Sequence, residues 1–158
     1  MINQDMFRSA WGNFATGVSV ITTIESNGEI HGMTANGIAS VSLEPMLVMV
    51  AIGHSANTHD IIKSSGKYGI NILSDQHVDI GKHFASSIKE FDPGILAKFS
   101  LTTNGIPFLK GALASMDCRV VKQHTEGDHT IFIGEVLDVV VNEGQPILFH
   151  KGKWIYLP

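Results

Sequence analysis

The chain has 158 residues, 44% of them hydrophobic, which predicts one domain with a sizeable apolar core. Its net charge of −4, with eleven Lys and Arg residues and no basic run, argues against binding to nucleic acid or to an anionic membrane surface. The single cysteine, Cys118, excludes an internal disulfide bond, and no run reaches the ~20 apolar residues of a membrane-spanning helix. With a polar N-terminus unlike a secretion signal, the sequence predicts a cytoplasmic protein.

The first predicted elements are a helix and a hairpin. Apolar residues recur on one helical face over residues 5–14, where Trp11 and Phe14 are expected to be core anchors. Residues 18–25 are rich in β-branched side chains and predict a strand. The Asn-Gly dipeptide at residues 27–28 is a strong signal for a β-hairpin turn, so the chain should return as a second strand.

The return strand leads into residues 32–45, a stretch dominated by Gly, Ala, Ser, Thr and Asn. These small residues fill little core volume, but they expose backbone groups and offer short hydroxyl and amide groups. Two interpretations are open. The stretch is either a loop between two strands or the wall of a site in which a flat, polar-edged ligand lies against the backbone.

A buried strand is expected next. Residues 46–52 form a continuous apolar run, which predicts a strand buried on both faces or a short buried helix. The β-branched content and the flanking Pro45 and Gly53 favour the strand.

Two short helices and a strand follow. Within residues 53–65, a short helix that contains residues 60–63 is expected, with Asn57 or Thr58 as its cap and Gly66 as its end. The next two elements are a strand over residues 68–73 and a helix over residues 75–84.

The second half of the chain is expected to be mostly β. Residues 85–105 are the least periodic and predict loops and a short helix of the kind that forms a lid or a binding edge. Residues 112–122 and 130–141 predict a long hairpin, and residues 146–150 and 153–157 predict two final strands. Because hairpins outnumber βαβ units, we predict a mainly β fold, a single-domain antiparallel barrel or sandwich with short peripheral helices.

Motifs for metal binding and nucleophilic catalysis are absent from the sequence. His54 and His59 are five residues apart and His77 and His83 are six apart, whereas two ligands on one helical face need a spacing of four. We therefore predict no metal site. Cys118 lies in a predicted strand and is expected to be a buried apolar residue. The sequence holds no G-x-S-x-G elbow, P-loop or G-x-G-x-x-G motif.

Several polar residues near predicted turns are candidates for binding a phosphate. The hydroxyl groups belong to Ser40, Ser42, Ser55 and Thr58. Lys82 and Lys98 could supply positive charge, and the helix start near residues 55–58 could supply backbone N–H groups. Solvated turns are the equally weighted alternative. His129, which follows a Gly-Asp turn at residues 127–128, either faces a ligand over the barrel edge or is simply exposed.

Seven segments carry a family resemblance. They are residues 14–22, 32–36, 40–45, 68–73, 111–114, 127–129 and 146–152. In this order, and over nearly the whole chain, they resemble the flavin reductase family, whose fold is an FMN-binding split barrel. The resemblance implies an antiparallel split β-barrel that forms a homodimer and binds FMN or FAD without covalent attachment. It also implies reduction of the flavin by NADH or NADPH, commonly to supply a partner monooxygenase.

The resemblance also implies site residues. The isoalloxazine ring is expected along Thr34, Ala35, Asn36 and Gly37. The ribityl and phosphate groups are expected at Ser40, Ser42, Ser55 and Thr58. The phosphates or an adenine are expected near Lys82, His83 and Phe84. The Gly-Asp-His motif is associated with the nicotinamide, and we expect His129 to orient that group or its phosphates rather than to transfer a proton.

The chain departs from the family pattern at two positions. Gly37 stands where many members carry Ser, which removes one hydroxyl near the flavin, and Met46 stands where a second Pro is common. No further domain is expected after residue 158. Two other classes stay open on the residues alone: a non-catalytic flavin-binding electron carrier and a small barrel without a cofactor.

Overall fold

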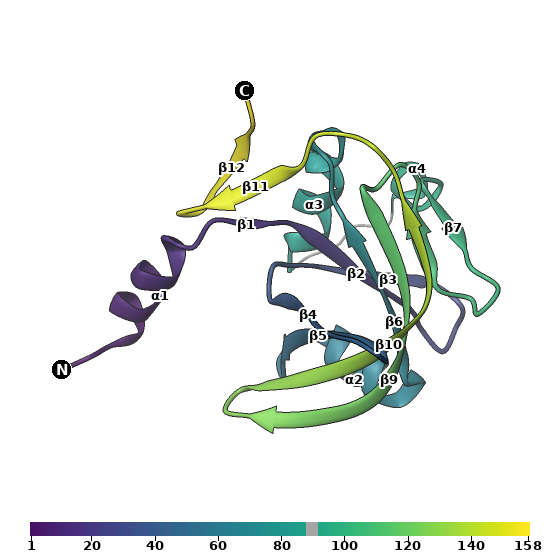
Figure 1. The fold of residues 1–158 in the computed structure, drawn as a ribbon, viewed down its shortest axis with the longest axis horizontal. Coiled ribbons are helices and arrows are strands. Elements are labelled where there is room, and N and C mark those ends of the chain that lie inside the picture. Colours follow the sequence, from purple (N-terminus) through teal and green to yellow (C-terminus); the bar gives the residue numbers. More distant parts are fainter. Residues whose placement is uncertain (88–91) are drawn as a thin grey trace.

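The computed structural model describes residues 1–87 and 92–158. Its main feature is a seven-stranded antiparallel sheet with the strand order β3-β2-β6-β9-β10-β5-β4 (Figure 1). In chain order these strands are β2 (Ser19–Ile24), β3 (Ile30–Ala35), β4 (Ile38–Leu43), β5 (Met46–Gly53), β6 (Lys67–Ile72), β9 (Ala114–Glu126) and β10 (His129–Val141). The two hairpins predicted from the sequence are confirmed as β2–β3 and β9–β10.

Asn36 and Gly37 close this sheet into a barrel. They are the only residues between β3 and β4, which are the two edge strands. A flat sheet of seven strands would separate its edges by about 29 Å, because neighbouring strands lie about 4.8 Å apart. The backbone across two residues spans only ~10 Å, so the edges must curl toward each other. The Gly37 carbonyl oxygen accepts a 2.9 Å hydrogen bond from the Ala51 N–H, which fixes this junction to β5.

The small-residue stretch at residues 32–45 is therefore mostly strand. It contains the end of β3, the junction at Asn36 and Gly37, all of β4 and the turn at residues 44–45. The loop interpretation is wrong outside the junction and that turn. The stretch contributes to both edge strands of the barrel.

Two apolar clusters pack on opposite faces of β2. Val20 joins the cluster that contains Phe84 of α3 (Val78–Ala85), and Ile21 joins the cluster that contains Ile62 of α2 (Asn57–Ser65). Strand β2 is thus buried on both faces. The double burial predicted for residues 46–52 is wrong, because full burial alternates with partial burial along β5.

The remaining short elements lie around the barrel (Figure 1). The helix predicted over residues 75–84 begins as a 3₁₀ turn, η1 (Asp75–His77), and continues as α3. The irregular region predicted over residues 85–105 contains a short helix, as expected, and also a strand that pairs with the segment after it. These elements are α4 (Pro93–Leu96), β7 (Phe99–Leu101) and β8 (Pro107–Leu109). The part of the prediction that falls on residues 88–91 lies outside the described residues.

The two ends of the chain meet in a three-stranded sheet, β1 (Thr16–Gly17), β11 (Ile147–His150) and β12 (Lys153–Tyr156). Helix α1 (Gln4–Gly12) precedes it and projects away from the barrel (Figure 1). Trp11 and Phe14 are 67% and 65% exposed, so the prediction that they anchor the core is wrong. Their rings instead stack on each other, with centroids 5.6 Å apart. Within the described residues, no helix combines the length and hydropathy needed to cross a membrane.

Candidate functional site

A cavity of about 300 Å³, here the helix cavity, lies at the N-terminal end of α2. Strand β3, the loop before α2 and the end of α3 contribute to its wall. Five hydroxyl-bearing residues line it: Thr34, Ser55, Thr58, Ser86 and Ser87. The structure thus brings together four of the predicted site residues, because Phe84 lies in the same wall as Thr34, Ser55 and Thr58.

The start of α2 has no side-chain cap. Its N-cap residue is Ala56, which makes no side-chain hydrogen bond, so the prediction that Asn57 or Thr58 caps the helix is wrong. A helix start carries backbone N–H groups without intrahelical partners and a partial positive charge. An alanine at this position leaves those groups available to an anion, and the adjacent hydroxyl groups add further donors.

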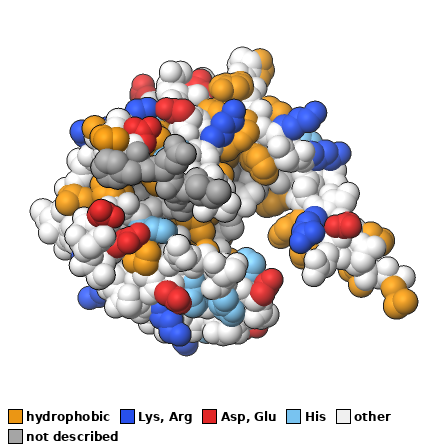
Figure 2. Space-filling model, turned by 180° about the vertical axis from the view of Figure 1, so that it is seen from behind, with side chains coloured by type: hydrophobic (Ala, Val, Ile, Leu, Met, Phe, Trp, Pro, Cys, Tyr) orange, Lys and Arg blue, Asp and Glu red, His pale blue; other side chains and the backbone are white. Residues whose placement is uncertain are grey.

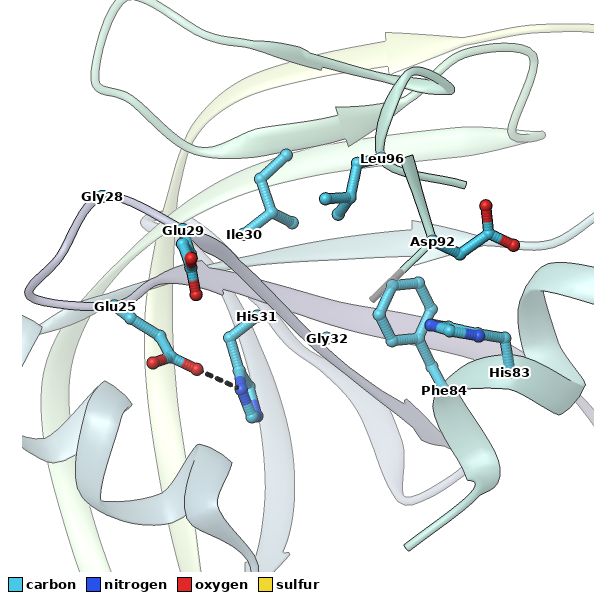
Figure 3. Close-up of a pocket in the computed structure, with 10 residues that line it drawn as sticks. All are labelled: Glu25, Gly28, Glu29, Ile30, His31, Gly32, His83, Phe84, Asp92 and Leu96. Carbon is cyan, nitrogen blue, oxygen red and sulfur yellow. Dashed lines mark hydrogen bonds and ion pairs between the residues drawn. The ribbon is translucent and has the colours of Figure 1, made fainter. Parts of the chain in front are cut away.

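Thr58 is held by a chain of buried polar groups that sequence reasoning missed. Its Oγ1 lies 2.8 Å from His31 Nε2, and His31 Nδ1 lies 3.0 Å from Glu25 Oε1. Figure 3 shows Glu25 and His31 side by side at the hairpin end of β3. The β2–β3 register places Thr23, not Glu25, opposite His31, so no pattern in the sequence indicated this contact.

A second cavity of about 380 Å³, here the acidic cavity, lies beside this chain (Figure 3). Its carboxylates belong to Glu25, Glu29 and Asp92, and His83 faces it from α3. Phe84 lines both cavities. Its ring packs on Gly32, where an added Cβ would lie only 2.6 Å from Phe84 Cε1. The absence of a side chain at Gly32 therefore sets the position of the aromatic wall between the cavities.

A third cavity of about 260 Å³, here the junction cavity, lies where β3 meets β4. Asn36 and Gly37 line it together with Trp11 and Phe14, and the Asn36 side chain donates to Thr16 Oγ1 at 3.2 Å. The predicted ring-binding segment begins at the helix cavity, where Thr34 donates to the Gly81 carbonyl oxygen at 2.6 Å. It continues through Ala35, whose carbonyl oxygen accepts from Ser19, to this apolar cavity.

Three other predicted residues do not join these groups. Ser40 is exposed on β4, and the Ser42 hydroxyl accepts from the Glu44 N–H at 3.2 Å; neither serine lines the helix cavity. Lys82 is exposed on α3 and lines neither the helix cavity nor the acidic cavity. Lys98, the other candidate cation, forms a 2.8 Å ion pair with Asp79, and this hydrogen bond lowers the pKa of the Asp79 carboxyl.

His129 begins β10 directly opposite Gly53, at the end of β5 that leads into α2. Its Nδ1 lies 2.6 Å from Asp128 Oδ1, and this hydrogen bond lowers the pKa of the Asp128 carboxyl. The ring is half exposed. The His54 N–H donates to the Asp128 carbonyl oxygen at 2.9 Å, which ties the hairpin turn to the loop before α2. His129 therefore lies at the same end of the barrel as Ser55.

Two histidines, His54 and His59, contact the same residue next to the β9–β10 turn. His54 Nε2 and His59 Nε2 lie 3.1 and 2.9 Å from the Thr130 hydroxyl oxygen. The five-residue separation of these histidines in the sequence did not predict that they lie together. They do so because both side chains contact Thr130, the first buried residue of β10. The described residues nevertheless contain no group of three or more His, Cys, Asp or Glu side chains placed to hold a metal ion.

Comparison with known proteins accounts for this arrangement. A family model described as a flavin reductase like domain matches residues 11–157. The chain belongs to this family. An NADH-dependent flavin reductase of Rhodococcus sp. is 40% identical over 149 residues, covering 93% of this chain and 82% of that protein.

Solved structures of flavin reductases share the fold. The styrene monooxygenase flavin reductase of Pseudomonas putida S12 is 32% identical with a TM-score of 0.87, covering 96% of this chain and 97% of that one. The NADH:FAD oxidoreductase SgcE6 of Streptomyces globisporus C-1027, in complex with NAD and FAD fragments, is 32% identical with a TM-score of 0.89. That likeness covers 99% of this chain and 93% of that one. The expected antiparallel split barrel is confirmed.

Proposed function

We propose that the protein is an NAD(P)H:flavin oxidoreductase that reduces FMN or FAD. The observation that carries the proposal is the hydroxyl-lined helix cavity at the uncapped start of α2, together with the separate junction cavity, which lies two residues farther along the same small-residue segment. A flavin nucleotide has the matching parts, an anionic phosphate end and a flat ring with polar edges. The family and the names of its NADH-dependent members support the same assignment and favour NADH as the donor.

Each part of the site has a defined task in this proposal. The α2 N–H groups with Ser55 and Thr58 bind the phosphate, and Ser40 and Ser42, which lie elsewhere on β4, are left as weaker candidates for the ribityl chain. The backbone of Thr34 to Gly37 lies against the ring edge, where N–H groups stabilise negative charge on the reduced ring. Phe84 borders the phosphates, His83 lies in the adjacent acidic cavity, and Lys82, which lines neither cavity, is given no contact in this proposal. The flavin and nicotinamide supply the hydride-transfer chemistry when bound.

Steady-state turnover tests the reductase assignment directly. The purified protein, supplied with FMN or FAD, should consume NADH with loss of the nicotinamide absorbance. Flavin binding without NADH or NADPH consumption would instead support a non-catalytic electron carrier, and a protein that binds no flavin at micromolar concentration would overturn both.

His129 is expected to hold the nicotinamide nucleotide. Asp128 fixes Nδ1, which leaves Nε2 for a ligand at the exposed end of the barrel. His129→Ala should raise KM for NADH about 5- to 20-fold and lower kcat less, because one polar contact is worth about 1–2 kcal/mol. His124→Ala, which removes an exposed histidine farther along the same hairpin, is the matched control. Unchanged kinetics in His129→Ala would remove this residue from the site.

A second copy of the chain is proposed to cover the projecting N-terminal segment. Four large apolar side chains of this segment are at least 59% exposed: Met6, Phe7, Trp11 and Phe14. Figure 2 shows apolar side chains along the same projection. Large apolar patches are rare on monomers. Because Trp11 and Phe14 line the junction cavity, a partner seated there would complete its wall. Light scattering should give about twice the chain mass of 17.1 kDa, and a monomeric mass would contradict the homodimer.

The physiological acceptor is proposed to be an oxygenase that takes up reduced flavin in the cytoplasm. The Pseudomonas putida relative is named as the flavin reductase of a styrene monooxygenase. The whole chain, residues 1–158, would act as one flavin reductase-like domain. Oxygenation of a model substrate by a monooxygenase that lacks its own reductase, in the presence of this protein, NADH and flavin, provides the test.

A further inference from the structure

We propose that His31 is a positioning residue that couples the binding of the flavin nucleotide's phosphate to the uptake of a proton. It acts through the hydroxyl of Thr58, which stands between His31 and the helix cavity. The inference rests on the proposed function, in which the phosphate groups occupy this cavity.

The geometry links three elements of the fold. Glu25 follows β2, His31 lies on β3 and Thr58 lies in the first turn of α2. Both ring nitrogens of His31 are engaged, Nδ1 with Glu25 at 3.0 Å and Nε2 with Thr58 at 2.8 Å. His31 and Thr58 are buried, being 9% and 1% exposed, so bulk water does not compete for these hydrogen bonds.

Neutral His31 turns the Thr58 hydroxyl away from an anion. An ionised carboxylate only accepts hydrogen bonds, so the Glu25 contact requires a hydrogen on His31 Nδ1. A neutral imidazole then has no hydrogen on Nε2, which must accept from the Thr58 hydroxyl. In this state Thr58 has only lone pairs to present to the helix cavity, and these repel a phosphate oxygen.

Protonated His31 reverses this hydrogen bond. Nε2 now donates to Thr58 Oγ1, and the hydroxyl hydrogen is free to turn toward a phosphate oxygen. The imidazolium also adds a positive charge behind the start of α2, and Glu25 stabilises it. Because an anion in the helix cavity favours the protonated state, reciprocity requires that anion binding draws a proton onto His31.

Other titratable groups face this region, and one of them provides a control. Around His31 they are Glu25, Glu29 and Asp92 of the acidic cavity and His83 of α3, while Asp60 of α2 lines a separate pocket with Glu25, and His59 of α2 contacts Thr130 instead. His59 and Asp60 bond to each other at 2.8 Å. The carboxylates all favour the imidazolium. His83 is a second histidine that lines the same cavity, so it is the matched control for His31.

Calorimetry in buffers of different ionisation enthalpy measures the proton uptake. The probe is FAD, whose diphosphate keeps a constant charge near neutral pH, added to full-length protein freed of flavin by dialysis. FAD binding should take up as much as one proton, and Kd should rise by up to about tenfold per pH unit between about pH 6 and 8. Riboflavin, which has the same ring and no phosphate, should bind with no uptake.

Variants assign the proton to one residue. His31→Gln keeps a hydrogen-bonding amide but cannot titrate, so its FAD binding should lose the proton uptake while riboflavin Kd stays within about twofold. His83→Gln should retain the uptake. Thr58→Val should raise the Kd of FAD at least tenfold at low pH and leave the Kd of riboflavin unchanged. Thr58→Ser keeps the hydroxyl and should therefore bind FAD with an affinity close to that of the native protein.

Each result decides the question. FAD binding without proton uptake in the native protein, uptake that persists in folded His31→Gln, or uptake lost only in His83→Gln would overturn the role of His31. Should His31→Gln fail to fold, the FAD-to-riboflavin comparison and the two Thr58 variants still decide it, since Thr58→Val with native FAD affinity contradicts the proposal. Absence of both FAD and riboflavin binding would instead overturn the proposed function itself.

Discussion

Replacing Gly37 with valine should weaken flavin binding about 100-fold, a loss of about 2.7 kcal/mol, while leaving the fold intact. Gly37 is one of the two residues that join the edge strands, and it lines the junction cavity. A Cβ at this position would meet Ala51 Cβ and the Ala51 carbonyl oxygen at 3.7 Å, which is ordinary van der Waals contact. The branched side chain would therefore extend into the space assigned to the ring without disturbing the barrel.

Quenching of flavin fluorescence measures the affinity, and thermal unfolding measures the fold. Ala39→Val is the matched control, because Ala39 lies two residues farther along the chain on β4, is exposed and does not line the junction cavity. Both variants should keep Tm within about 4 °C of the native protein. Native flavin affinity in Gly37→Val would mean that the ring does not lie along the junction.

Local sequence signals located most of the strands because those signals are themselves local. The hairpin turn at residues 26–28 involves only adjacent residues, among them the Asn-Gly dipeptide, and Gly28 has a φ of +87°. Gly66, with a φ of +70°, ends α2 where the sequence indicated. The position of β3 and β4 at the two edges of the sheet could not be predicted in this way, because it depends on the order of all seven strands.

Errors in the prediction fall where burial depends on distant parts of the molecule. The spacing of Trp11 and Phe14 on one helical face is that of a core helix, yet both lie outside the core of this chain. The same apolar pattern suits an intersubunit surface, and a single sequence cannot distinguish the two. The missing cap at Ala56 is a different case, because a good capping residue stands next to it in the sequence while the backbone starts the helix one residue earlier.

Only part of the candidate site could be predicted from the sequence, because some of its contacts depend on distant parts of the chain. Thr34 of β3, Ser55 of the loop before α2, Thr58 of α2 and Phe84 of α3 meet in one cavity, and each had been named from the family resemblance. His31 and Glu25 were missed because no motif contains them, and only the folded hairpin aligns them with Thr58. The resemblance therefore named side chains that line a common cavity, whereas the groups that contact Thr58 behind it required the structure.

Asn71 illustrates a buried polar residue whose role in the fold no pattern revealed. It lies on β6, within a segment predicted simply as a strand, and it is fully buried. Its Oδ1 accepts from the Leu109 N–H and from the Ser115 hydroxyl, both at 2.8 Å. Its Nδ2 donates to the Val20 carbonyl oxygen at 3.2 Å and to the Thr22 hydroxyl at 3.1 Å. One amide thus joins β2, β6, β8 and β9.

Asn71→Leu should lower the free energy of unfolding by about 4 kcal/mol, because it conserves volume but leaves the Leu109 N–H and the Ser115 hydroxyl unpaired at a cost of about 1–3 kcal/mol each. Urea unfolding followed by circular dichroism measures the change. Asn104→Leu is the control, since Asn104 is exposed and donates a 3.0 Å hydrogen bond to the buried carboxylate of Asp117, so its loss should cost about 2 kcal/mol, half the loss at Asn71. Equal losses in the two variants would contradict the view that this amide holds the four strands together, because Asn71 is buried and bonds to three other strands whereas the Asn104 side chain bonds to Asp117 alone among the described contacts.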